Sequence, residues 1–407
     1  MRLHSGIYLW PETVPNRPQY PALSEDISCD CLIVGGGIGG ALCANLLSKK
    51  GVKTVLIDKR EIASGSTLTN TGLLQYSSDK TLSSFIQTFG EETAVHFYRL
   101  SQRALVKLQE ISSQFEPNAR LIPRSSLYLA STLDDVDVLR EEFETQRRFQ
   151  FPAEWWDEEM IRERFPFTRP AAIYTYGDAE VNPLMLVHEL IQEASSNGVR
   201  VYEHSNVNGF QFHENDVKCR SGKWEITAKH IIFATGYETQ QFKKDQGANL
   251  TSSYVTVTEP VQDFNDWYQR CLIWETARPY SYLRTTPDGR IISGGLDEHL
   301  PGGVLEDNRY IHQSKKLLNV IHTMFPRKAA LKSEYAWGAV FGGTRDGLPY
   351  IGPHPDYPHC YFLEGYGGNG TVCSMIAAEM ITDVLTGIHR PDMEIFSLIR
   401  TSKPNRR

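Results

Sequence analysis

Long apolar runs and an excess of basic charge are both missing from this chain of 407 residues. No apolar stretch reaches the length of about 18 residues that a membrane-spanning helix needs. The 42 Lys and Arg residues against 49 Asp and Glu residues give a net charge of −7, which argues against a general nucleic-acid surface. Residues 1–28 are polar and rich in proline, so we expect an extended arm there and no signal peptide. The sequence therefore predicts a cytoplasmic protein with no integral membrane segment and no nucleic-acid partner.

Paired cysteines are also missing. The seven cysteines are odd in number and scattered along the chain. Cys29 and Cys31 form a lone C-x-C, and no second pair completes a zinc site. We expect reduced thiols and no bound metal.

A glycine cluster lies within residues 29–58, the stretch around which the rest of the chain is organised. An apolar strand, Cys31–Val34, enters the glycine cluster Gly35–Gly40, and a helical pattern follows over Ala41–Lys49. A second strand, Lys53–Ile57, ends in an acid, Asp58. This is G-x-G-x-x-G in a strand–turn–helix context with an acid about 20 residues further on, which indicates an adenine dinucleotide site.

Each part of this fingerprint has a physical role. Gly35 allows the tight turn, Gly37 lets the backbone approach a pyrophosphate, and Gly40 lets the helix pack close to the strand. The amides and the positive dipole end of the helix face the phosphates. The Asp58 carboxylate would accept hydrogen bonds from a ribose diol, which disfavours a cofactor with a 2′-phosphate.

Three further stretches favour a flavin over a nicotinamide. Residues 64–72 form a loop rich in hydroxyl groups just after the ribose acid, and the strand Ile231–Phe233 leads into Ala-Thr-Gly. The loop Leu363–Gly370 spells a second G-x-G-x-x-G, but no strand ending in an acid follows its helix. We interpret it as a helix N-terminus aimed at the pyrimidine edge of a flavin, where its dipole would stabilise the reduced anion.

The order of the expected elements predicts an interleaved α/β (α+β mixed) fold. A Rossmann-like FAD-binding domain would be assembled from residues 1–75, 173–240 and 335–407. A substrate domain built on a mixed or antiparallel sheet would come from the two insertions, 76–172 and 241–334.

Several motifs in a fixed order extend this interpretation over most of residues 29–390. After the glycine fingerprint they are Ser64–Thr67, Asp178–Pro183, Ala234–Gly236, Tyr280–Gly289 with Gly294-Gly295, Thr344–Gly352 and Gly365–Gly370. The set resembles the D-amino-acid oxidase and glycine oxidase superfamily of FAD-dependent amine oxidoreductases.

The resemblance implies a set of FAD contacts, with Val207 at the adenine and Asp346–Gly352 beside the flavin. Together with the fingerprint, the expected cofactor-binding residues are Gly35, Gly37, Ile38, Gly40, Asp58, Lys59, Ser64, Ser66, Thr67, Gly72, Leu73, Val207, Ala234, Thr235, Gly236, Asp346, Gly367, Gly368, Asn369, Gly370 and Thr371.

The chain departs from relatives of this superfamily at two points. Sarcosine oxidases attach the flavin to a cysteine shortly before the position matching Asp346, and no cysteine lies between Trp337 and Asp346 here, so we expect non-covalent FAD. Glycine oxidase holds the substrate carboxylate with an arginine five residues before that aspartate, where this chain has Phe341. The expected substrate-pocket residues are Tyr254, Tyr282, Arg284 and Phe341. Arg345 is a further possible partner for an anion, and Arg284 could instead pair with Asp288 or Glu275.

The resemblance predicts oxidation of the CH–NH bond of an amine or amino acid, with hydride transfer to flavin N5, an imine product and hydrogen peroxide formed from oxygen. We assign no catalytic side chain. Three alternatives stay open: a dehydrogenase that passes electrons to a quinone or partner protein, a monooxygenase that uses NAD(P)H, and a flavoprotein subunit without turnover of its own.

Overall fold

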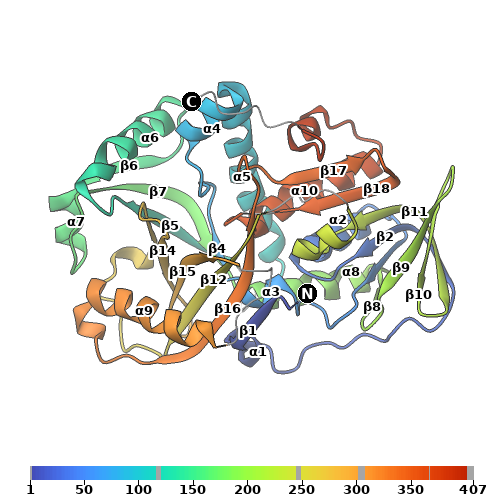
Figure 1. The fold of residues 1–407 in the computed structure, drawn as a ribbon, viewed down its shortest axis with the longest axis horizontal. Coiled ribbons are helices and arrows are strands. Elements are labelled where there is room, and N and C mark those ends of the chain that lie inside the picture. The colour runs from blue at the N-terminus through green and yellow to red at the C-terminus, as the bar shows by residue number, and fades with distance from the viewer. Residues whose placement is uncertain (1, 116–120, 244–248, 301–307, 366, 401–407) are drawn as a thin grey trace.

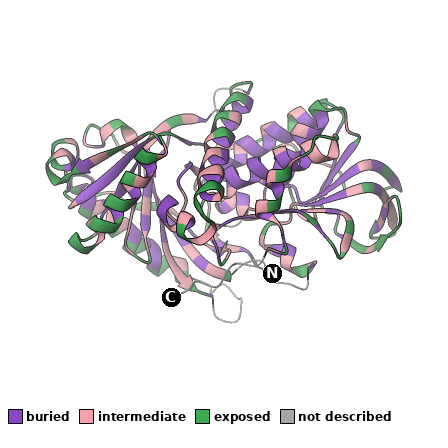
Figure 2. Ribbon diagram, turned by 90° about the horizontal axis from the view of Figure 1, so that it is seen from above, coloured by how far each residue is buried: buried purple, intermediate pink, exposed green. Residues whose placement is uncertain are grey.

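Two sheets organise the computed structural model, which describes residues 2–115, 121–243, 249–300, 308–365 and 367–400 (Figure 1). The sequence pattern predicts a helix from Glu306 to Met324, and the start of that helix lies outside the described residues, as does the chain end at 401–407. Buried residues fill the central helices and the strands, whereas the outward faces of the peripheral helices are exposed (Figure 2). Within the described part of the chain, no helix has the length and apolar character needed to cross a bilayer.

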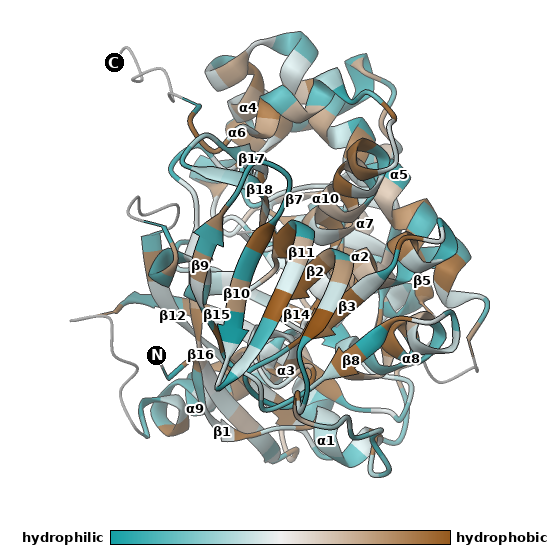
Figure 3. Cartoon of the chain, turned by 90° about the vertical axis from the view of Figure 1, so that its right-hand side faces the viewer, coloured by the Kyte–Doolittle hydropathy of each residue, from teal (hydrophilic) through white to brown (hydrophobic). Residues whose placement is uncertain are grey.

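The smaller, eight-stranded sheet contains the glycine fingerprint. Five neighbouring strands of this sheet run parallel to one another, in the order β18, β11, β2, β3 and β8. Strand β17 pairs antiparallel with β18, β10 pairs antiparallel with β11, and β9 pairs with β10. The bounds are β2 (Ile27–Val34), β3 (Thr54–Ile57), β8 (Arg200–Tyr202), β9 (Val207–Phe212), β10 (Val217–Ser221), β11 (Trp224–Phe233), β17 (Tyr350–His354) and β18 (Tyr357–Glu364). The central strands contain near-continuous apolar runs, as buried parallel strands require (Figure 3).

The larger, ten-stranded sheet is mixed and follows the order β1-β16-β12-β15-β14-β13-β5-β7-β4, with β6 on β7. Most neighbours are antiparallel, and β13 runs parallel to β5. The bounds are β1 (His4–Ile7), β4 (Leu73–Leu74), β5 (Ile122–Leu129), β6 (Ala153–Asp157), β7 (Ala171–Glu180), β12 (Asn249–Thr258), β13 (Leu272–Glu275), β14 (Ser281–Thr285), β15 (Ile291–His299) and β16 (Ser333–Gly343).

Helices α2, α8, α10 and α5 pack against one another beside the smaller sheet. The helices are α1 (Trp10–Thr13), α2 (Ile38–Lys49), α3 (Ser66–Thr69), α4 (Leu82–Phe89), α5 (Glu91–Ser112), α6 (Val136–Arg148), α7 (Glu158–Arg164), α8 (Pro183–Ser196), α9 (Arg309–Met324) and α10 (Gly370–Leu385). The Asn182 side chain caps the first turn of α8, accepting hydrogen bonds from the amides of Leu184 and Met185. The sequence predicts a helical pattern from Leu82 to Phe115, but the structure divides it at Gly90, whose φ of 87° ends α4.

The expectation of an extended, non-helical N-terminal arm is wrong. Strand β1 pairs antiparallel with β16, and α1 follows it. Pro11 is tolerated because it lies in the first turn of α1, where its missing N–H leaves no helical hydrogen bond unmade.

Two of the expected segment boundaries fall within strands, since residue 173 lies inside β7 and residue 335 lies inside β16. Both strands pair within the larger sheet, as do β1 and β4 from the first segment. The division into an FAD-binding and a substrate domain stays a proposal, and these four strands would extend the substrate domain.

Candidate active site

The carboxyl ends of four parallel strands meet at one edge of the smaller sheet. Val34 of β2 is in register with Ile57 of β3 and with Phe233 of β11, which in turn faces Phe362 of β18. Gly35, Asp58, Ala234 and Gly365 follow directly after these strands and are thereby brought together. Ligands of open α/β sheets bind at such an edge.

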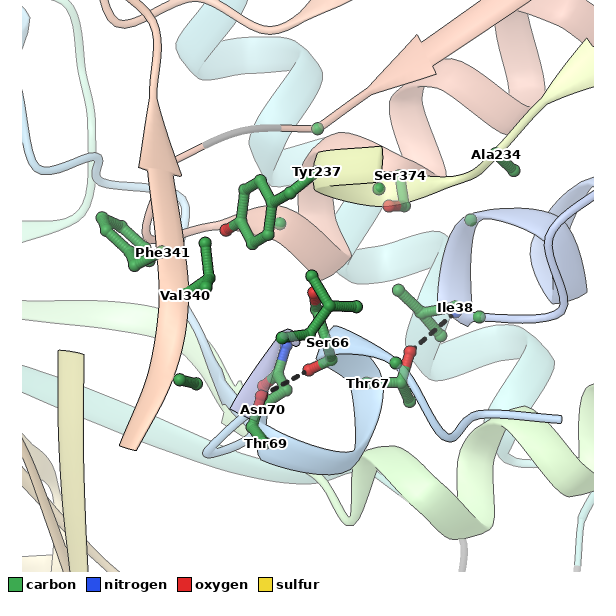
Figure 4. A pocket seen from close by; sticks show the side chains of 18 of the residues that line it. Ile38, Ser66, Thr67, Thr69, Asn70, Ala234, Tyr237, Val340, Phe341 and Ser374 are labelled. Atoms are coloured by element: carbon green, nitrogen blue, oxygen red, sulfur yellow. Dashed lines mark hydrogen bonds between the residues drawn. The ribbon is translucent and has the colours of Figure 1, made fainter. Parts of the chain in front are cut away.

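The glycine loop between β2 and α2 is tightly packed. Gly35 has a φ of 111°, and a Cβ atom there would lie 2.4 Å from the Ala234 carbonyl oxygen. A Cβ atom on Gly40 would lie 1.9 Å from the Gly35 carbonyl oxygen, so the glycine allows the close helix–strand contact predicted from the sequence. Gly37 has no side chain with which to cap α2, and the Ile38 amide donates to Thr67 Oγ1 at 3.0 Å (Figure 4). The remaining first-turn amides have no partner within the helix and suit an anion.

Asp58 is fixed at the end of β3 by two backbone amides. Its Oδ2 accepts from Gly36 N at 2.7 Å and its Oδ1 from Arg60 N at 2.8 Å. Burial raises the pKa of this carboxyl, and the two amide donors and Arg60 oppose that shift. Because each carboxylate oxygen can accept more than one hydrogen bond, the pair of ribose hydroxyl groups expected from the sequence can be accommodated.

A continuous cavity runs from this loop to the face of the larger sheet. Tyr237, Val340 and Phe341 face Ser66 and Asn70 across it (Figure 4). Sixteen of the expected cofactor residues line it: Gly35, Gly37, Ile38, Asp58, Lys59, Ser66, Thr67, Leu73, Val207, Ala234, Thr235, Gly236, Gly367, Gly368, Asn369 and Gly370.

The other five expected cofactor residues do not line the cavity. Gly40 packs against Gly35, and the Gly72 amide donates to Asn70 Oδ1 at 2.7 Å. Ser64 Oγ donates to the Glu61 carbonyl, and Thr371 Oγ1 accepts from Asn70. Asp346 forms an ion pair with Arg400.

Only two of the four expected substrate residues, Tyr282 and Phe341, line the cavity. The Tyr254 hydroxyl donates to Glu298 at 2.9 Å, away from the lining. Arg284 is buried, and its Nη1 donates to the carbonyl oxygens of Gly72 and Val181 at 2.8 and 3.1 Å. Neither side chain lines the cavity, and among the described residues the Arg284 guanidinium forms its hydrogen bonds with Gly72 and Val181 and not with Asp288 or Glu275.

Several lining residues escaped the sequence analysis. Asp79 accepts hydrogen bonds from Gly368 N at 3.0 Å and from the Tyr280 hydroxyl at 3.3 Å. The other prominent ones are Ser77, Tyr237, Ser253 and Trp274. The sequence signal was weak, because Ser77–Asp79 is a short polar segment with no periodicity and no motif.

Charge divides the cavity into two ends. Among the described lining residues the basic side chains are Lys59 and Arg60, which lie at the Asp58 end and pair with Glu238 at 2.9 and 2.7 Å. Burial acts to raise the pKa of Glu238, but Arg60 and Lys59 hold it below its ordinary value. The other end carries the carboxylate of Asp79 and the aromatic side chains of Tyr237, Trp274 and Tyr280.

The residues present fit a dinucleotide such as FAD. The uncapped N-terminus of α2 suits a pyrophosphate, Asp58 suits a ribose, and the loop before α10 lies further along the same cavity. A Cβ atom on Gly37 would lie 3.2 Å from Thr67 Oγ1, on the cavity wall.

Comparison with known proteins supports the same cofactor. The family model described as "FAD dependent oxidoreductase" (DAO) matches residues 30–384. Gamma-glutamylputrescine oxidoreductase of Escherichia coli (strain K12) is 25% identical over 384 residues, covering 90% of this chain and 86% of the relative. Glycine oxidase of Bacillus subtilis (strain 168) is 21% identical over 361 residues, covering 88% of this chain and 92% of the relative.

Solved structures share the fold. Glycine oxidase from Geobacillus kaustophilus superposes with a TM-score of 0.77 at 19% identity, covering 92% of this chain and 99% of that one. L-proline dehydrogenase from P. horikoshii gives a TM-score of 0.77 at 20% identity, covering 92% of this chain and 97% of that one. The predicted α/β fold and the predicted cofactor are confirmed, and the chain belongs to the DAO family of FAD-dependent oxidoreductases.

Proposed function

We propose that this enzyme oxidises the CH–NH bond of an amine. FAD, when bound, would accept a hydride from the carbon next to the nitrogen, the nitrogen would lose a proton, and water would hydrolyse the resulting imine. Reoxidation by oxygen, which takes up two electrons and two protons, would give hydrogen peroxide.

The observation that carries the proposal is the single cavity shared by the two sheets. The residues expected to hold FAD lie at the smaller sheet, and Tyr282 and Phe341 approach from the larger sheet. A substrate bound against the larger sheet would therefore be in contact with the reactive part of the cofactor. Holding the two reactants together in this way would accelerate the reaction.

The residues of this chain would bind and orient the cofactor and the substrate, and would exclude water from the reacting atoms. Thr67 and the α2 amides would hold the pyrophosphate, and Asp58 the ribose. The N-terminus of α10 would stabilise negative charge that develops on the flavin. No cysteine occurs among the described residues that line the cavity, which supports non-covalent FAD.

The names of the relatives support amine oxidation in part. Gamma-glutamylputrescine oxidoreductase and glycine oxidase are both named for substrates that contain an amine. The structural neighbour named L-proline dehydrogenase supports the second candidate, in which the same half-reaction delivers electrons to an acceptor other than oxygen.

Anaerobic reduction of the bound flavin tests the proposal. The purified protein is mixed with monoamines, diamines, N-methyl amino acids and D-amino acids, and the flavin band at about 450 nm is followed. Bleaching by one class supports amine oxidation, and air is then readmitted while peroxide is assayed. Rapid return of the colour with peroxide supports an oxidase, and slow return supports the dehydrogenase. A bound flavin that no amine bleaches would contradict the proposal and favour a monooxygenase or a subunit without turnover.

A further inference from the structure

The aromatic end of the cavity contains an acidic group, Asp79, where an amino-acid oxidase would need a cation. Asp79 lines this end and is held by the Gly368 amide and the Tyr280 hydroxyl. Asp297, on β15, is close enough to raise the pKa of the Tyr280 and Tyr282 hydroxyl groups further, in addition to their burial. Two carboxylates therefore act on the same aromatic wall.

A hydroxyl group in the same wall is left without a partner. Ser77 is 6% exposed and lines the cavity, and its Oγ forms no hydrogen bond. Its carbonyl accepts from Asn369 Nδ2, which holds the segment beside the Gly367–Gly370 loop. The buried hydroxyl of Ser77 and the half-buried carboxyl group of Asp79 provide two acceptors for a donor that enters the cavity.

Burial raises the pKa of Asp79, and the charge of Arg278 opposes that shift, but the hydrogen bonds of Arg278 are made elsewhere. Arg278 stacks on the Tyr280 ring at 5.1 Å, and its Nη1 donates to the carbonyl oxygens of Glu275, Thr276 and Ala277. It does not line the cavity, and neither does Arg284. A substrate carboxylate would thus face Asp79 with no basic group among the described lining residues at this end.

The chemistry of hydride transfer limits which cationic group of the substrate Asp79 can bind. The reacting nitrogen must be unprotonated, because its lone pair drives the hydride from the neighbouring carbon. A carboxylate beside an ammonium stabilises the protonated form, so Asp79 paired with the reacting nitrogen would oppose the reaction. Asp79 is compatible with the reaction when it binds a cationic group of the substrate other than the reacting nitrogen.

We propose that Asp79, with Ser77, binds the distal ammonium group of an aliphatic diamine, while the other amine is oxidised at the flavin. The proposal rests on the proposed amine oxidation and names its substrate class. The charge-assisted hydrogen bond to Asp79 and the faces of Tyr237 and Trp274 would both favour the ammonium. Zwitterionic amino acids would be rejected.

The test compares diamines with monoamines of equal length. Values of kcat/KM are measured for 1,3-diaminopropane, 1,4-diaminobutane and 1,5-diaminopentane, each against the matching n-alkylamine, and for sarcosine. We expect the best diamine to exceed its monoamine by about 10-fold or more, and Asp79→Asn to reduce this ratio to about one. Asp288→Asn, which removes an exposed carboxylate of a hairpin outside the cavity, should leave the ratio unchanged.

Binding without turnover gives a second readout. The dithionite-reduced holoenzyme cannot oxidise an amine, so calorimetric titration with each diamine and monoamine measures affinity alone. We expect the diamine preference to appear here and to disappear in Asp79→Asn. Ser77→Ala, a milder change, should weaken diamine binding about 3- to 10-fold while flavin content stays normal.

Failure of this inference is distinguishable from failure of the proposed function. Oxidation of monoamines or sarcosine with no preference for diamines, or an unchanged ratio in Asp79→Asn, would overturn the inference alone. Absence of flavin reduction by any amine would overturn the amine oxidation on which it rests.

Discussion

Asp346 and Arg400 form a two-point ion pair that joins the loop after β16 to the end of the described chain. Arg400 Nε donates to Oδ2 at 2.8 Å and Nη2 donates to Oδ1 at 2.9 Å. The guanidinium also donates to the carbonyl oxygens of Leu348 and Pro349 and stacks on the Tyr350 ring at 3.7 Å. Burial acts to raise the pKa of Asp346, but Arg400 holds it below its ordinary value. The pair therefore fixes the loop next to the cavity from outside.

Removing the guanidinium should destabilise the fold strongly. Arg400→Ala leaves a buried carboxylate without its partner, and we expect a loss of about 3–5 kcal/mol in the free energy of unfolding, measured by urea denaturation. Arg162→Ala, which removes an exposed i,i+4 pair with Glu158, should cost below about 0.5 kcal/mol. Equal losses in the two variants would show that the Asp346 pair contributes no more than a surface pair.

Asp178 should make stability fall as pH rises. Burial raises the pKa of this carboxyl from 3.8 to about 6, so its protonated form is favoured by folding. That contribution is fully present below pH 3.8 and is lost as pH rises through 6. Relative to Asp178→Asn, wild type should lose up to roughly 3 kcal/mol of unfolding free energy between pH 4 and pH 7. A difference between the two proteins that does not change with pH would contradict this.

Gly37 should be required for FAD affinity more than for folding. A Cβ atom there would lie 3.2 Å from Thr67 Oγ1, in the wall that faces the pyrophosphate. We expect Gly37→Ala to fold and to raise the dissociation constant of FAD about 10-fold or more, as measured by fluorescence titration of the apoprotein. Gly343→Ala is the matched control, because no atom lies within 4 Å of the added Cβ. Similar FAD affinity in both variants would argue against this placement of the cofactor.

Phe341 offers a gain-of-function test of substrate charge. Phe341→Arg would place a cation on the cavity wall, at the position where the resemblance to glycine oxidase implies an arginine. We expect kcat/KM for sarcosine or glycine to rise about 10-fold relative to that for 1,4-diaminobutane, because a carboxylate gains a charged partner. Phe341→Leu keeps the wall apolar and should not change this ratio. An unchanged ratio in Phe341→Arg would show that this position does not contact the substrate.

The sequence by itself determined the cofactor and the fold class. The turn at Gly35, the uncapped start of α2 and the acid at Asp58 depend on contiguous residues, because backbone sterics and helix-end hydrogen bonding act over a few positions. The order of the motifs was enough to predict an FAD-dependent relative of glycine oxidase, and the family match confirms it. Sixteen of the expected cofactor residues line one cavity, because the pairing of β2, β3, β11 and β18 brings distant segments to one edge of the sheet.

Only the tertiary structure decided which side chains line the end of the cavity proposed for the substrate. Strand periodicity placed Arg284 on the same face as Tyr282, yet the backbone carbonyls of Gly72 and Val181, distant in the chain, bind its guanidinium in the interior. Asp79 reaches the cavity because the loop before α10 donates an amide to it across nearly 290 residues of chain. The direction of a side chain and the partner of a strand depend on long-range packing, which no local pattern encodes.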